Sequence, residues 1–230
     1  MLSRFKLPIL SLFLSAGMST GLQFLSIPSS ANDLIVFRSS WRNPSFLNAQ
    51  GKSPELSFAY GKWFGETENL SFNWQGKIRS NNAGIAMRYV GINDMELRGN
   101  TPISEPLGYY GAYGVATKAV TSFSKGNLNY GFALQLISMQ IYQDASTGFA
   151  ADLGISWQVN ERINLAASVL NAGKMNAFRN ERPVLPARLN GILSYKINST
   201  DIFLSVETNE LIEEPIYSIG SAFKIDNIFF

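Results

Sequence analysis

The stretch from Gly148 to Trp157 limits the possible folds more than any other part of the chain. Its odd-numbered residues are apolar, and its even-numbered residues are Gly148, Ala150, Asp152, Gly154 and Ser156. Successive side chains of a strand point to opposite faces, so this alternation predicts a strand with one apolar face and one small or polar face. Two folds accommodate such a strand. One is a soluble antiparallel sheet with a wet face, and the other is a membrane β-barrel that is apolar toward lipid and polar toward its lumen.

The same period of two recurs along the rest of the chain. It predicts further strands within 56–61, 70–75, 84–89, 109–116, 129–141, 163–169, 189–196, 202–207 and 217–224. Together with the stretch above, this gives about ten strands, most of them separated by short connectors rich in Gly, Asn, Asp and Ser, which suit tight turns. Two connectors are longer, 93–108 and 174–186. In 129–141 the apolar face changes phase after Leu136, which predicts a β-bulge there.

The N-terminus has the pattern of an export signal. Arg4 and Lys6 are followed by an apolar run over 7–14 and by small residues up to Gly21. That run is too short to cross a bilayer as a helix, which needs about 20 residues. We therefore divide the chain into a signal peptide (1–21), an N-terminal segment tucked against or into the barrel (22–53), and the barrel itself (54–230).

The composition of the two strand faces favours the membrane barrel. The non-apolar face is mostly Gly, Ala, Ser, Asn and Gln, with isolated charges at Arg88, Asp152, Lys196, Glu207 and Lys224. Aromatic residues lie near strand ends, as they do in the girdles of outer-membrane barrels. The alternative is a secreted β-sandwich with an aromatic core that binds a partner.

Composition also excludes several kinds of site. The 230 residues include no cysteine and no histidine, so disulfides, Cys/His zinc sites and Ser-His or Cys-His nucleophile pairs are ruled out. The formal net charge of +2 gives no reason to expect a nucleic-acid partner. We predict no catalytic, cofactor or metal site, and we interpret the acidic group Glu207, Glu210, Glu213 and Glu214 as a solvated turn.

Three sequence motifs carry a family resemblance. They are Gly148-Phe149-Ala150-Ala151-Asp152-Leu153-Gly154, then Asn171-Ala172-Gly173, then Leu185-Pro186. Upstream, the segment Trp41-Arg42-Asn43-Pro44-Ser45-Phe46-Leu47 adds an Asn-Pro pair. With these motifs the chain resembles the PorV/PorQ-like family of outer-membrane proteins, within the FadL-type transporter superfamily.

The resemblance implies a function and a location. It implies a bacterial outer-membrane β-barrel with a role in type IX protein secretion at the cell surface. The partners would be outer-membrane lipid, exported proteins and other secretion components. The alternative that it leaves open is FadL-like passage of hydrophobic small molecules. It also implies a barrel of fourteen strands, so this chain, with about ten, is either a reduced barrel or an incomplete one. We favour the incomplete barrel and expect the sheet to be unclosed.

The candidate site residues are predicted to be structural. A carboxylate in a barrel lumen needs a partner, so Asp152 is expected to pair with Arg88 or Lys196. Asn171 and Gly173 are expected to shape a strand end, because glycine permits positive φ. Asn43 and Pro44 are expected to fix a tight turn in the N-terminal segment.

Overall fold

A computed structural model describes most of the chain after residue 21. The described residues are 22–26, 28, 33, 39–48, 54–63, 66–79, 81–100, 104–210, 212–225 and 228–229. The predicted signal peptide, 1–21, lies outside them, and so do the side chains of Glu213 and Lys224.

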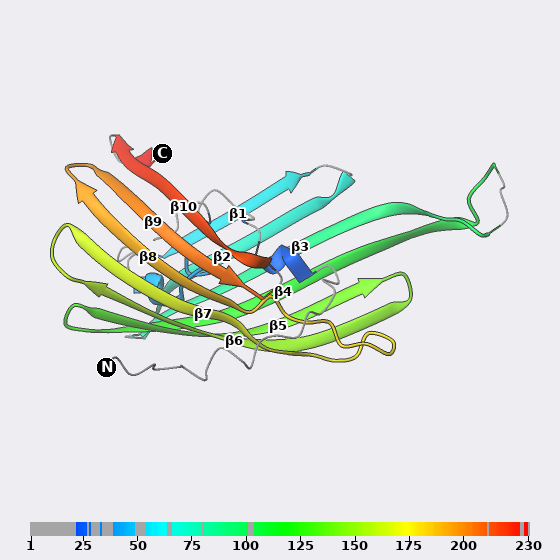
Figure 1. Cartoon of the computed structure of the whole chain (residues 1–230), viewed down its shortest axis with the longest axis horizontal. Helices are drawn as coiled ribbons and strands as arrows, with labels where there is room; N and C mark the ends of the chain where they lie inside the picture. Colours follow the sequence, from blue (N-terminus) through cyan, green and yellow to red (C-terminus); the bar gives the residue numbers. More distant parts are fainter. Residues whose placement is uncertain are drawn as a thin grey trace, which may run out of the picture.

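The chain forms one antiparallel sheet in which every strand pairs with its sequence neighbours (Figure 1). The strands are β1 (Glu55–Lys62), β2 (Glu68–Ile78), β3 (Asn81–Leu97), β4 (Gly108–Lys125), β5 (Leu128–Ile141), β6 (Asp144–Gln158), β7 (Ile163–Met175), β8 (Arg188–Ile197), β9 (Thr200–Asn209), β10 (Ile212–Ile225) and the two-residue β11 (Ile228–Phe229). The prediction of an all-β antiparallel fold is confirmed. A sandwich would need two packed sheets, whereas the described strands form a single one.

The sheet is open over the described residues. There, β1 pairs only with β2, and β10 pairs with β9 and β11. No backbone pairing joins β1 to β10 in this part of the chain, so the sheet has two free edges. This agrees with the expectation that the chain does not close its sheet.

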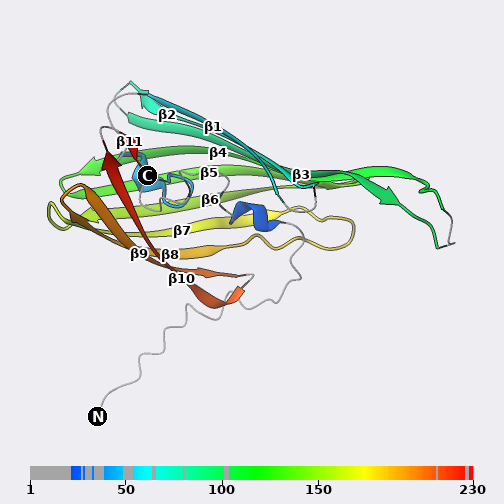
Figure 2. The same ribbon diagram turned by 90° about the horizontal axis from the view of Figure 1, so that it is seen from above.

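The sheet is curved, and the described parts of the N-terminal segment, 22–26 and 39–48, lie on its concave side (Figures 1 and 2). Two short 3-10 helices belong to this segment, η2 (Leu22–Leu25) and η3 (Pro44–Asn48). η3 contacts β3, β4, β5 and β6, and η2 contacts β4. Among the described residues, no helix is long and apolar enough to cross a membrane.

The two faces of the sheet differ as the alternating pattern predicts. In β6, Leu153 is 58% exposed on the convex face, whereas its neighbour Asp152 is fully buried on the concave face. Ile155 and Trp157 are also exposed, and Ser156 is buried. In the middle of the sheet the concave face is buried, because described residues of the N-terminal segment cover it there.

The predicted bulge near Leu136 is wrong. The pairing of β5 with both β4 and β6 runs without a shift from Leu128 to Ile141. Instead Ile137 and Met139 lie on the concave face, where they pack in a buried apolar cluster with Leu25 and Trp41 of the N-terminal segment. The change of apolar phase reflects this local packing and not an inserted residue.

Candidate functional site

The N-terminal segment is fixed to the sheet by Asn43. Its side-chain Oδ1 accepts hydrogen bonds from the Ser45 backbone N–H at 2.9 Å and from the Ser45 hydroxyl at 2.7 Å. These bonds hold the turn that opens η3, as predicted. The Asn43 amide also donates to the carbonyls of Ile155 on β6, at 3.4 Å, and of Ala167 on β7, at 3.1 Å. One side chain therefore fixes both the turn and its position on the sheet.

Two glycines of the sheet make room for this turn. Gly131 on β5 and Gly154 on β6 face each other across the pair. A Cβ on Gly154 would lie 2.0 Å from Asn43 Oδ1, and one on Gly131 would lie 2.1 Å from the Pro44 carbonyl carbon. The motif residues Asn43 and Pro44 thus pack directly on Gly154, and this close approach leaves no room for a side chain at that position of the sheet.

Asp152 pairs with Lys118, and the prediction that it pairs with Arg88 or Lys196 is wrong. Lys118 Nζ lies 2.5 Å from Asp152 Oδ2, and each side chain is at most 1% exposed. The other carboxylate oxygen, Oδ1, accepts the backbone N–H of Asn171 at 2.6 Å. Asp152 therefore joins β4, β6 and β7 on the concave side.

Asn171 lies in a β-bulge that Asp152 stabilises. The pairing of β6 with β7 shifts between Ala151 and Leu153, so Leu170 and Asn171 together face Asp152. Asn171 has a φ of +58°, which asparagine tolerates better than most residues. Its side-chain amide donates to the Pro186 carbonyl at 3.0 Å. The Asp, Asn and Pro of the three motifs are therefore one structural unit.

Gly173 has a different role from the one predicted. Among the described glycines, only Gly126 has a positive φ. A Cβ on Gly173 would lie 2.0 Å from the carbonyl oxygen of Phe149 and 2.6 Å from the Cα of Ala150. Gly173 is needed because β6 approaches too closely for a side chain, and not because of its φ.

Trp41 contacts two buried cations of the sheet. The Arg88 guanidinium carbon is 3.8 Å from the Trp41 ring centroid, and Lys118 Nζ is 4.0 Å from it. Lys118 also donates to the Trp41 carbonyl at 3.1 Å, and the indole N–H donates to the Leu25 carbonyl at 3.1 Å. Arg88 pairs with Asp33 of the N-terminal segment at 2.7 Å. Cations of the sheet and an aromatic ring of the segment therefore stabilise each other by cation–π contact.

A second charged group connects the segment to β8 and β9. Arg188 Nη1 lies 3.4 Å from Glu207 Oε1, and Arg42 Nη1 lies 3.8 Å from Glu207 Oε2. Burial lowers the pKa of the Arg42 guanidinium, and the Glu207 carboxylate opposes that shift. Glu207 is therefore a buried ion-pair residue of β9, which corrects its predicted place in a solvated turn.

The predicted lumenal residues are only partly brought together. Asp152 and Arg88 are both buried on the concave side, each with its own partner. Lys196 lies near the end of β8 with an exposed side chain and has no part in this cluster. Lys118 and Trp41 were missed. Continuing the alternation of Gly114 and Ala116 by one step places Lys118 on the same face, so the signal for it was present in the sequence.

The convex face contrasts with this charged interior. The strand pairing places Leu70, Phe72 and Trp74 of β2 beside Tyr60, Phe58 and Leu56 of β1, and similar apolar rows continue to Tyr217 and Ile219 of β10. Lys62, Glu68, Glu96, Lys125 and Lys174 occupy paired convex positions of these rows, and all of them lie near strand ends. Between those ends, the convex positions of the described strands carry no charged residue.

Neither a possible metal site nor similarity to a known protein indicates a chemical activity for this site. No group of three or more acidic residues in the described part of the chain could hold a metal ion. No family model matches the sequence, and no curated protein matches it. The site is thus defined by its geometry, which is a network of ion pairs and hydrogen bonds between a curved sheet and its N-terminal segment.

Proposed function

We propose that the chain forms the wall of a bacterial outer-membrane β-barrel, with its convex face in lipid. The observation that carries this proposal is the absence of charge between the strand ends of that face, over the strand residues that the structure describes. Many of its large apolar side chains are about half exposed or more, including Phe58 at 65%, Leu136 at 70% and Ile219 at 80%. A soluble monomer rarely exposes an apolar patch larger than a few hundred Å². A lipid-facing barrel wall needs such a surface.

The lengths of the connections support one orientation in the membrane. At one end of the sheet the turns are short, at 126–127, 159–162 and 198–199. At the other end lie the longer connections 98–107 and 176–187, and the β3–β4 hairpin extends beyond its neighbours there (Figure 1). Outer-membrane barrels have short periplasmic turns and longer outer loops. In this proposal the long connections therefore face the cell exterior.

The proposed role is in type IX protein secretion, as the resemblance implies. A filled concave side supports this role better than it supports a conduit. Trp41, Asn43 and Phe46 of the N-terminal segment are buried against the sheet, and Asp33–Arg88 and Arg42–Glu207 ion pairs hold the segment there. A barrel with an occupied interior is suited to hold or hand on exported proteins through its outer loops.

Deletion of the gene in its native host tests this role. Two readouts are needed, the release of proteins with C-terminal sorting domains and the uptake of a long-chain fatty acid. We expect deletion to abolish release and leave uptake unchanged. Restoration by the wild type, but not by Leu153→Lys, would link release to an intact membrane wall. Loss of uptake with normal release would instead establish the FadL-like alternative.

A further inference from the structure

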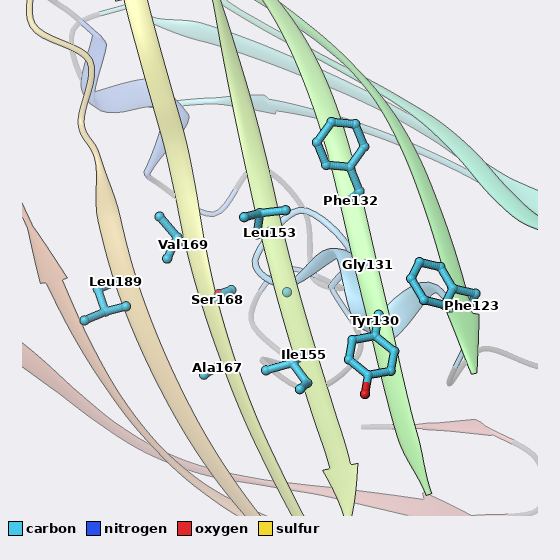
Figure 3. A pocket seen from close by; sticks show the side chains of 11 residues that line it. Phe123, Tyr130, Gly131, Phe132, Leu153, Ile155, Ala167, Ser168, Val169 and Leu189 are labelled. Carbon is cyan, nitrogen blue, oxygen red and sulfur yellow. The ribbon is translucent and has the colours of Figure 1, made fainter. Parts of the chain in front are cut away.

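The convex face has an apolar hollow of about 400 Å³ over β5, β6 and β7 (Figure 3). Phe132, Leu153 and Val169 lie along one side of it, and Tyr130 and Ile155 lie along the other. No charged side chain lines it. It is an apolar depression on the convex face, bordered by large apolar side chains.

Small residues on both faces of the sheet create the hollow. On the convex side Ala167 faces Gly191 across the β7–β8 pair, so two adjacent positions lack large side chains. The backbone of Gly131 and Gly154 lies beneath, where Pro44 and Asn43 contact it from the concave side. Ser168 donates its hydroxyl to the Arg42 carbonyl, on the concave side. The floor is thus apolar and is supported from behind by the N-terminal segment.

One end of the hollow carries polar groups. The Phe123 and Tyr130 rings are stacked with centroids 5.3 Å apart, and the Tyr130 hydroxyl points toward the ends of β5 and β6 (Figure 3). Lys125 lies two residues beyond Phe123 on the same face, about 7 Å further along the strand. It is exposed at the short-turn end of the sheet. An apolar depression therefore leads, past an aromatic pair, to a single cation.

We propose that the hollow binds one acyl chain of an anionic phospholipid whose phosphate contacts Lys125. The uncharged lining suits a hydrocarbon chain, and the aromatic pair suits the membrane interface. The ammonium group complements the net negative charge of a phosphatidylglycerol headgroup, which the choline cation cancels in phosphatidylcholine. This inference rests on the proposed function, because it places the hollow within the bilayer. It adds a defined lipid site to a surface that would otherwise contact lipid without selectivity.

Native mass spectrometry of the full chain tests the site. The protein is reconstituted in vesicles of equal parts phosphatidylglycerol and phosphatidylcholine, extracted into detergent and progressively delipidated. We expect the wild type to retain one phosphatidylglycerol. Ala167→Phe fills the hollow and should lose this lipid, whereas Ala119→Phe, on the same face outside the hollow, should retain it. Lys125→Gln should remove the preference for phosphatidylglycerol.

Each other outcome contradicts a distinct part of the inference. Equal retention by both phenylalanine variants, or occupation of the hollow by a second copy seen as a lipid-free dimer, would overturn the lipid site. An unchanged headgroup preference in Lys125→Gln would overturn the phosphate contact. Failure of the wild type to float with the vesicles would refute the proposed function itself, whereas insertion without a retained lipid would refute only the hollow.

Discussion

Asp152→Asn should destabilise the protein strongly, because it leaves a buried lysine without its counter-ion. Lys118 Nζ is 2.5 Å from Asp152 Oδ2, and the two side chains are 1% and 0% exposed. Removing one partner of a buried ion pair costs about 3–5 kcal/mol, since the remaining charge is left unpaired in a poorly solvated site. The asparagine oxygen can still accept the Asn171 N–H, so the loss should come mainly from the charge.

The same strand supplies a matched control. Asp144, at the start of β6, also lies 2.5 Å from its partner, Arg179, but the two side chains are 29% and 69% exposed. Asp144→Asn should cost no more than about 1 kcal/mol, because water screens an exposed pair. The two variants share the chemical change and the ion-pair distance, and they differ in burial.

The assay is urea unfolding of the reconstituted protein. The free energy of unfolding of each variant is measured and compared with that of the wild type. The double variant Asp152→Asn with Lys118→Met should recover part of the loss, because it removes the unpaired charge. Equal costs for Asp152→Asn and Asp144→Asn would refute the reasoning. So would a double variant no more stable than Asp152→Asn. At equal amounts of folded protein, we expect Asp152→Asn to retain its secretion activity.

Three further variants test other contacts. Gly154→Ala places a Cβ 2.0 Å from Asn43 Oδ1 and should lower the free energy of unfolding by about 1–3 kcal/mol. The control is Gly191→Ala, whose Cβ would have its nearest neighbour 3.4 Å away, and it should change the free energy of unfolding by less than about 0.5 kcal/mol. Trp41→Ala should cost about 3–5 kcal/mol and increase proteolysis of the N-terminal segment, because it removes a buried ring that contacts two cations. Unchanged proteolysis would contradict the anchoring role. Leu153→Lys, in the middle of β6, should destabilise the bilayer-inserted protein by about 2–4 kcal/mol, and Trp157→Lys, near the strand end, by about 0–1 kcal/mol. Equal costs at these two positions would argue against a lipid-facing strand.

The strands were predictable because their signal is local. The alternation in Gly148 to Trp157 gave the strand and its two faces directly, and the structure places Leu153 and Asp152 on opposite sides as expected. The ends of the strands were less predictable. β4 continues to Lys125, well beyond the predicted 109–116. The prediction stopped short because the next convex residues are the small Thr117 and Ala119, which do not stand out as apolar.

The site was less predictable because its contacts join residues far apart in the sequence. Asn43 reaches Ala167, and Lys118 reaches Asp152, through the curvature of the sheet and not through any local pattern. The predicted bulge at Leu136 failed for the same reason, since Ile137 and Met139 are apolar where the N-terminal segment packs on them. The bulge that the structure has at Asn171 carries no apolar phase change. It is marked only by an asparagine opposite an aspartate.

Spin-label accessibility along β6 tests the central claim most directly. Single labels at positions 152 to 157 of the protein in phospholipid bilayers are compared for collision with oxygen, which concentrates in lipid, and with a water-soluble nickel chelate. A lipid-facing convex surface predicts high oxygen accessibility at 153, 155 and 157 and low accessibility at 152, 154 and 156. A uniform profile, or nickel accessibility at 153 and 155, would contradict the membrane wall.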